Sequence, residues 1–253
     1  SGECASRTNL EMPDVQQELL AELAKTGKPV VLLNFAGRPT VLSWENEHIP
    51  AIMNVWFGGS EVGDALCDVI FGDKVPSGKL TTSMPKTTGQ EPLYYNHQNT
   101  GRPVPDDNQK FAKFASNCLD VSNGPLYPFG YGLSYTTFEY GDLKLSSHEV
   151  NMDDWKITAT INVKNTGSRD ADEIVQLYVR DMVASISRPV KELKGFQRIH
   201  LAAGESREIS FDITPGMLKF YNAELKHVIE PGDFQIMVGG NSKEVKTQNL
   251  TVK

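Results

Sequence analysis

The sequence predicts two fold classes in succession, an α/β part followed by an all-β antiparallel sandwich. In residues 1–90, short continuous apolar runs alternate with stretches of helical periodicity, a pattern typical of parallel strands joined by helices. From residue 135 onward, apolar and polar residues alternate with a period of two between turn signals, which predicts antiparallel strands with one buried face. We therefore expect a partial α/β domain at 1–90, a crossing segment at 91–133 and a β-sandwich at 134–253.

The first expected element is a helix at residues 12–27. Pro13 suits its first turn, and Val15, Leu19 and Leu23 recur at the spacing of one helical face. The other expected elements are strands at 29–35 and 49–56, each buried on both faces, a helix between them, and a helix at 60–70. Since buried parallel strands need neighbours on both sides, two strands make an incomplete sheet. We expect the missing strands to lie outside this sequence.

The second half carries the strand signals of a sandwich. The expected strands lie at 155–163, 174–179, 196–201, 209–213, 218–221 and 234–238. Their number and spacing fit an immunoglobulin-sized sandwich. No cysteine follows Cys118, so the disulfide of antibody domains is absent, and a fibronectin type III-like sandwich fits better. Recurrent prolines and aromatic residues between 85 and 131 indicate a long ordered crossing segment.

Composition excludes several function classes. The net charge of −7 argues against a nucleic-acid partner, which requires a basic face. No apolar run is long enough for a membrane helix. Cys4, Cys67 and Cys118 are widely spaced, and the five histidines share no metal-like spacing with them or with each other. We expect no metal site and no cofactor.

Four segments, in this order, resemble the family 3 glycoside hydrolases of the bacterial β-glucosidase type. They are VVLLNFAGRP at 30–39, WFGGSEVGDALCDVIFGDKVPSGKL at 56–80, LYPFGYGLSYTTF at 126–138 and SRPVKELKGF at 187–196. Enzymes of this kind have a (β/α)8 barrel with the nucleophilic Asp, an α/β sandwich with the acid/base Glu, and a fibronectin type III-like domain. The resemblance covers the end of the second part and the whole of the third.

The same resemblance implies roles for two residues. In the family, the acid/base Glu often follows a Gly and precedes a Ser-Arg-x-Asp/Asn-Leu segment. Gly2-Glu3 followed by Ser6-Arg7-Thr8-Asn9-Leu10 matches this pattern, so Glu3 is expected to be the general acid/base. Arg7 is a weaker candidate for contact with the sugar or with Glu3. The implied nucleophile lies on a barrel carried by another chain or by a removed N-terminal part.

The resemblance implies a β-glucoside or oligosaccharide substrate, with a homodimer as one option. It favours the periplasm or a secreted location, while the cytoplasm stays open. A β-xylosidase, or another exo-glycosidase of the same family, is an alternative. A binding module without catalysis is a second alternative, because a fibronectin-like sandwich alone would suit one. Two aromatic features have two interpretations each. Trp56 is either a core residue or a platform on which a sugar ring stacks, and residues 94–102 either pack domains together as cement or line the rim of the active site.

Overall fold

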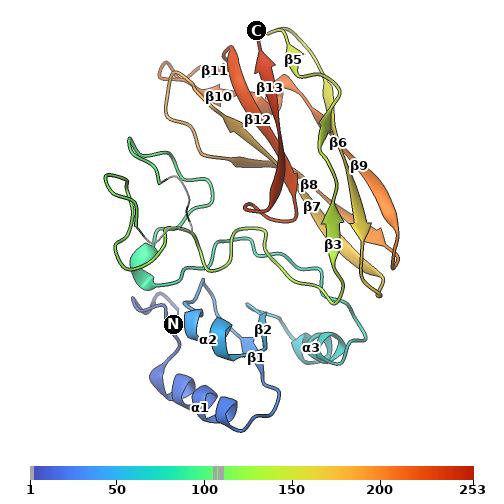
Figure 1. Cartoon of the computed structure of the whole chain (residues 1–253). Coiled ribbons are helices and arrows are strands. Elements are labelled where there is room, and N and C mark those ends of the chain that lie inside the picture. The colour runs from blue at the N-terminus through green and yellow to red at the C-terminus, as the bar shows by residue number, and fades with distance from the viewer. Residues whose placement is uncertain (1–2, 105–106, 108–110) are drawn as a thin grey trace. The chain divides into compact units, whose positions relative to one another are not determined.

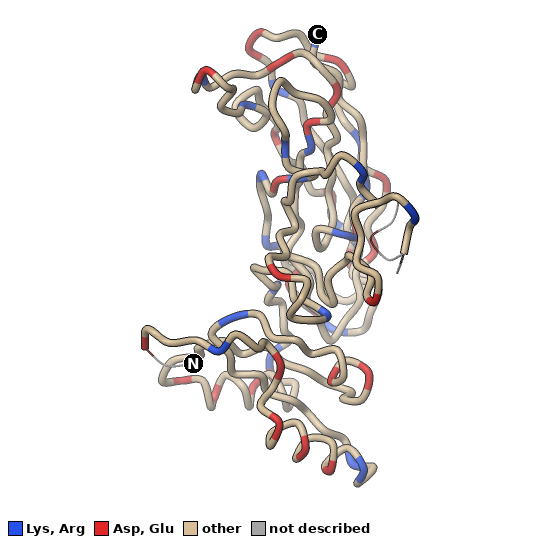
Figure 2. The backbone as a smooth tube through the Cα atoms, turned by 90° about the vertical axis from the view of Figure 1, so that its left-hand side faces the viewer, with Lys and Arg blue, Asp and Glu red and all other residues tan. Residues whose placement is uncertain are grey.

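The protein was analysed as a computed structural model that describes residues 3–104, 107 and 111–253 (Figure 1). The chain divides by contacts into two compact units, which are described separately. The α/β unit comprises Ser1–Asp73, Thr82–Tyr94 and Val104–Pro128, and the sandwich unit comprises Lys74–Thr81, Tyr95–Pro103 and Phe129–Lys253. Acidic and basic residues are interspersed along both units (Figure 2).

The α/β unit contains the predicted alternation of helices and strands. Its two described strands pair in parallel, with Val31 opposite Ala51 and Asn34 opposite Asn54, as expected. The elements are α1 (Asp14–Lys25), β1 (Val31–Asn34), α2 (Ser43–His48), β2 (Ala51–Asn54), α3 (Val62–Ile70) and the 3-10 turn η1 (Thr88–Gln90). The loop between η1 and the sandwich is anchored by backbone hydrogen bonds between Met84 and Leu126–Tyr127.

The prediction that both strands are buried on two faces is wrong for this chain. Val31 is 45% exposed and Phe35, just after β1, is 55% exposed. The predicted apolar stripe of α1 is also open, since Val15 and Leu19 are 76% and 61% exposed while Leu20 is buried. Burial on two faces requires a second packing layer, and the described residues of this unit do not place one over these side chains.

The sandwich unit has two large sheets and a separate two-stranded antiparallel sheet made of β10 (Phe220–Tyr221) and β11 (His227–Val228). One large sheet has the strand order β5-β13-β12-β7-β8, and in the other large sheet β6 pairs with β3, β4 and β9. Neighbours are antiparallel except β5 and β13, which are parallel. The long strands are β6 (Ile157–Asn165), β7 (Ala171–Asp181), β8 (Glu192–Leu201), β9 (Ser206–Ile213), β12 (Gly232–Gly239) and β13 (Val245–Val252). The short elements are β3 (Phe138–Tyr140), β4 (Lys144–Leu145), β5 (Glu149–Val150), α4 (Pro215–Leu218), β10 (Phe220–Tyr221) and β11 (His227–Val228).

The period-two pattern is confirmed by the core between the sheets. On β6 the alternate residues Ile157, Ala159, Ile161 and Val163 are buried, and they belong to the same apolar cluster as Phe211 on β9. The strand β13 was not predicted from the sequence, and Leu218, which was expected in a strand, lies in the short helix α4. Pro215 explains the latter, because its fixed backbone angle suits the first turn of a helix.

All three cysteines are free thiols, so the sandwich is held by its apolar core. Among the described residues, no helix is long and apolar enough to cross a membrane.

Candidate functional site

The segment that carries Glu3 lies on the surface of the α/β unit. Glu3 is in an exposed turn, and Cys4 beside it adopts a left-handed backbone conformation with φ of 55°. Ser1 and Gly2 lie outside the described residues, so the predicted Gly-Glu step is described only at its Glu. In the described part of the chain, Glu3 has no hydrogen-bonding partner that would fix its carboxylate. Its role as proton donor stays a prediction.

Arg38 fastens this segment to the first strand of the sheet. Its guanidinium donates a hydrogen bond to the backbone carbonyl of Arg7 and a longer one, 3.5 Å, to the carbonyl of Asn9. Leu10 continues the attachment, since its carbonyl accepts a 3.0 Å hydrogen bond from Val41 N–H. Arg38 follows β1 in the turn Gly37-Arg38-Pro39, at the carboxyl end of the strand. That edge is where open α/β sheets place their ligand-binding residues.

Arg7 is fixed through its backbone rather than through its side chain. The carbonyl of Arg7 is the acceptor for Arg38, and its side chain is exposed. The predicted sugar contact of Arg7 therefore stays a prediction. In the sequence, Arg38 stood out only as a member of the family-like segment 30–39. The signal that could have identified it is a guanidinium in the turn that follows the carboxyl end of a parallel strand.

A polar cluster lies at the same carboxyl ends of β1 and β2. Asn34 Nδ2 donates to Asn54 Oδ1 at 2.7 Å and to Thr40 Oγ1 at 3.0 Å. Asn54 Nδ2 is buried and has no hydrogen-bond partner among the described residues. Because a buried unpaired amide is costly, such a group marks a place where a further polar partner would be stabilising. The cluster was not predicted from the sequence.

Trp56 follows β2 and is half-buried, with a left-handed φ of 56°. A bulky residue in this conformation is strained, and strained backbone concentrates at functional sites. The adjacent Val55 N–H donates to the Asn34 carbonyl at 2.9 Å and holds the chain as it leaves β2. Half-burial fits neither a fully packed core residue nor an open sugar platform, so both interpretations of Trp56 remain.

The aromatic segment 94–102 is divided between packing and exposure. Tyr95 stacks on Phe129 with ring centroids 4.1 Å apart and meets Tyr178 edge-on at 6.0 Å. Its hydroxyl accepts a 3.2 Å hydrogen bond from Leu193 N–H. Tyr95 therefore packs between segments of the sandwich unit and has a structural role there. Tyr94, by contrast, is 64% exposed.

The histidines lie apart from one another. His48 stacks on Trp44 with centroids 4.3 Å apart, and His200 Nδ1 lies 2.7 Å from Asp172 Oδ1. Hydrogen bonding to His200, followed by that to Arg198, lowers the pKa of Asp172. Within the described ranges, no group of three or more His, Cys, Asp or Glu residues could hold a metal ion.

Comparison with known proteins identifies the family. The family model described as glycosyl hydrolase family 3 C-terminal domain matches residues 1–135, and a fibronectin type III-like domain model matches residues 173–242. A periplasmic beta-glucosidase of Salmonella typhimurium is 48% identical over 244 residues, covering 96% of this chain and 32% of that protein. A beta-xylosidase of Formosa agariphila is 44% identical, covering 100% of this chain and 34% of that protein.

Solved structures agree with the sequence comparison. The beta-glucosidase from Listeria innocua in complex with glucose has a TM-score of 0.92 and 40% identity, covering 100% of this chain and 34% of that one. The GH3 beta-glucosidase of Bifidobacterium adolescentis has a TM-score of 0.81 and 28% identity, with coverages of 99% and 37%. The chain thus spans about a third of the length of these relatives. It belongs to glycosyl hydrolase family 3, in which it corresponds to the C-terminal domain and the fibronectin type III-like domain that follows.

Proposed function

We propose that this chain is the C-terminal part of a retaining β-glucosidase and that Glu3 is its general acid/base. The observation that carries the proposal is the 48% identity over 96% of the chain to a protein named as a beta-glucosidase. The attachment of residues 7–10 by Arg38 and Val41 supports it, because a proton donor must be presented on a positioned segment.

The chemistry requires a second carboxylate from the remainder of the enzyme. A retaining glycosidase places its nucleophile and its acid/base about 5–5.5 Å apart. The acid/base carboxyl protonates the departing oxygen, and later removes a proton from the water that releases the sugar. To hold its proton at neutral pH it needs apolar surroundings or a nearby carboxylate. Glu3 is exposed in this chain, so the nucleophile-bearing barrel would have to supply that environment.

The open apolar side chains of the α/β unit support a covering partner. Val15, Leu19 and Leu23 form one face of α1, and their exposures are 76%, 61% and 44%. Phe35, which follows β1, is also exposed. Apolar side chains gathered in this way are typical of a surface that another part of the protein covers. We assign this face to the N-terminal part of the same enzyme, which also carries the expected barrel.

A β-xylosidase is the second candidate, because the relative with 44% identity carries that name. The residues that would distinguish glucose from xylose are expected mainly on the barrel. A periplasmic location is proposed from the Salmonella typhimurium relative, which is named periplasmic.

The test uses this chain together with the N-terminal part of its enzyme. Glu3→Gln and the matched control Glu47→Gln, an exposed carboxylate on α2, are assayed with aryl β-glucosides and aryl β-xylosides. We expect kcat for Glu3→Gln to fall by about 10²–10⁴-fold, the usual contribution of general acid–base catalysis. Azide should restore turnover, because it attacks the glycosyl-enzyme without needing a base. Unchanged turnover in Glu3→Gln, or an equal loss in both variants, would contradict the assignment of Glu3.

A further inference from the structure

Phe57 presents an open aromatic ring at the carboxyl edge of the small parallel sheet. It lies three residues after β2, and Gly37 lies three residues after β1. Because β1 and β2 run parallel, both positions belong to the same edge of the sheet. The Phe57 residue is 86% exposed, the highest value among the large apolar residues that the structure describes. Its position makes it a candidate for a ligand contact, since open α/β sheets place their ligand-binding residues at this edge.

The backbone on both sides of Phe57 is held in place. Trp56, which precedes it, has a left-handed φ of 56°, a strained conformation for a bulky residue. Gly58, which follows it, packs against the start of α3, because a Cβ at Gly58 would lie 2.1 Å from Val62 Cγ2. Backbone strain of this kind persists only where the surrounding structure imposes it. The course of the chain at Phe57 is therefore set by its neighbours.

The ring of Phe57 is anchored at its outer end. A Cβ on Gly37 would lie 2.9 Å from Cζ and 3.1 Å from Cε2 of Phe57, so this end of the ring rests against the bare backbone of the glycine. A side chain at position 37 would displace the ring. The rest of the ring is open to solvent, as the exposure of 86% requires. A ring that is anchored at one end and open elsewhere suits stacking against a flat ligand.

Gly37 connects this ring to the segment that carries Glu3. The next residue, Arg38, donates a hydrogen bond to the backbone carbonyl of Arg7. Glu3 is four positions before Arg7, so the two Cα atoms lie at most about 14 Å apart. One turn thus holds both the Phe57 ring and the segment of the proposed proton donor.

The chemistry of the reaction assigns this part of the site to the leaving group. The general acid protonates the oxygen of the departing group, so it lies beside that group. An aromatic ring on the element that holds the general acid is therefore placed to contact the leaving group. A second sugar unit offers the flat C–H face of its ring, and an aryl group offers its π face. Both faces are apolar and stack favourably on an aromatic side chain.

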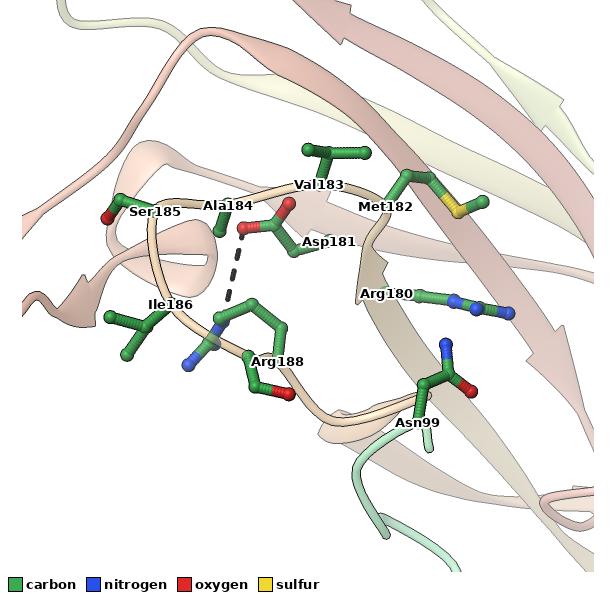
Figure 3. Close-up of a pocket in the computed structure, with 10 residues that line it drawn as sticks. Asn99, Arg180, Asp181, Met182, Val183, Ala184, Ser185, Ile186 and Arg188 are labelled. Atoms are coloured by element: carbon green, nitrogen blue, oxygen red, sulfur yellow. Dashed lines mark ion pairs between the residues drawn. The ribbon is translucent and has the colours of Figure 1, made fainter. Parts of the chain in front are cut away.

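The depression in the sandwich unit offers no comparable place for a ring (Figure 3). Residues 180–188 and Asn99 line it, and none of these described residues is aromatic. Asp181 and Arg188 lie 3.9 Å apart in it and form an ion pair, with side chains that are 7% and 14% exposed. The charges of this pair are compensated within the protein, so Phe57 is the better supported binding residue.

We propose that Phe57 binds the leaving group of the substrate by stacking on its ring, and that Gly37 keeps the Phe57 ring in position. The leaving group is a second sugar unit or an aryl group, which share a flat apolar face. This inference rests on the proposed β-glucosidase function and adds to it a residue that selects for ring-bearing leaving groups.

The test uses this chain together with the N-terminal part of its enzyme. kcat/KM is measured with cellobiose, with p-nitrophenyl β-D-glucopyranoside and with methyl β-D-glucopyranoside, whose leaving group has no ring. The corresponding xylosides serve if the enzyme prefers xylose. In Phe57→Ala, the ratio of kcat/KM for a ring-bearing substrate to that for the methyl glycoside should fall about two- to tenfold, the size of one aromatic contact. The substrate whose ratio falls identifies the kind of ring that Phe57 binds.

Two further variants sharpen the test. Gly37→Ala keeps the phenyl group but displaces its outer end, and it should lower the same ratio. Its cost in stability should be small, because the atoms that must move belong to the end of an open side chain. Phe71→Ala is the matched control, since Phe71 is 79% exposed and follows α3 at the opposite end of that helix from Phe57. The control should leave the ratio unchanged.

Unchanged ratios in Phe57→Ala for both ring-bearing substrates would overturn the inference. An equal loss of kcat/KM for all three substrates, or a lower melting temperature with unchanged ratios, would also overturn it, because the N-terminal part would then cover the ring. Failure of the β-glucosidase proposal gives a different result, in which the wild-type enzyme hydrolyses none of these glycosides and this inference falls with it. Failure of the Glu3 assignment alone would appear in Glu3→Gln and would leave these ratios as they are.

Discussion

Lys79 Nζ lies 3.1 Å from Glu173 Oε1, and this ion pair joins two residues 94 positions apart inside the sandwich unit. The same Nζ donates to the Gly132 carbonyl at 3.0 Å, and the Tyr140 hydroxyl donates to Glu173 Oε1 at 2.9 Å. The Lys79 side chain is 14% exposed and that of Glu173 is 4% exposed. The segment 74–81 is thereby fixed to β7.

Replacing Lys79 should destabilise the sandwich unit. Lys79→Met leaves the Glu173 carboxylate buried without its counter-ion, and breaking a buried pair in this way costs about 3 kcal/mol or more. Lys156→Met is the matched control, because Lys156 and Asp212 form a pair whose side chains are 61% and 58% exposed. The control should cost about 0–1 kcal/mol. Urea unfolding followed by Trp155 fluorescence, with Trp44 and Trp56 replaced by Phe throughout, measures both. Equal losses would contradict a special role for the buried pair.

The loss caused by Lys79→Met should depend on pH. Burial raises the pKa of Glu173, while Lys79 opposes that rise. A carboxyl with a raised pKa in the folded state loses stability as pH rises above its unfolded value of about 4.3. Without Lys79 the pKa rises further, so the difference from wild type should be small near pH 4 and grow toward neutral pH. In Lys79→Met/Glu173→Gln this pH dependence should disappear. A loss in the single variant that is constant across this range would refute the explanation.

Two glycines near this pair should differ sharply in their tolerance of alanine. A Cβ at Gly132 would lie 2.2 Å from the Gly78 carbonyl oxygen, a backbone atom that cannot swing away. A Cβ at Gly78 meets nothing within 4 Å. Gly132→Ala should cost about 1–3 kcal/mol, as overpacking usually does, and Gly78→Ala should change the free energy of unfolding by less than about 0.5 kcal/mol. Thermal unfolding of the two variants measures this difference in stability. Similar melting temperatures would contradict the close approach of Gly132 to the Gly78 carbonyl oxygen.

Loss of Arg38 should loosen the segment that carries Glu3. Arg38→Ala removes the hydrogen bonds to the carbonyls of Arg7 and Asn9, so backbone amides of residues 4–10 should exchange faster with deuterium. Arg7→Ala is the control, since it keeps the backbone carbonyl that Arg38 binds. If Arg7→Ala accelerates exchange as much as Arg38→Ala does, the side chain of Arg7, and not the hydrogen bond from Arg38 to its carbonyl, holds this segment in place.

The elements that local sequence patterns determine were predictable, and the exceptions have physical causes. The alternation on β6 and β9 reflects one buried face. On β7, however, Val175 through Val179 are all buried. Gln176 and Tyr178 point away from the core, but they are covered because Gln176 bonds to the Gly130 and Gly240 carbonyls and Tyr178 meets Tyr95. Such cover comes from distant segments, which periodicity cannot reveal.

The candidate site was predictable only where a family pattern exists. The Gly-Glu and Ser-Arg pattern singled out Glu3 and Arg7, and it identified neither Arg38 nor the Asn34–Asn54 pair. These contacts span 31 and 20 positions, and nothing in their local sequence marks the partners.

The sandwich unit consists of three segments of the chain, residues 74–81, 95–103 and 129–253. The chain therefore passes between the two units five times. A gene recombination that exchanged only residues 134–253 would carry Glu173 without Lys79 and Tyr178 without Tyr95 and Phe129. Such a graft would begin with an orphaned buried carboxylate and an uncovered tyrosine. The inherited module is therefore a set of three segments, and shuffling between relatives should succeed only when all three move together.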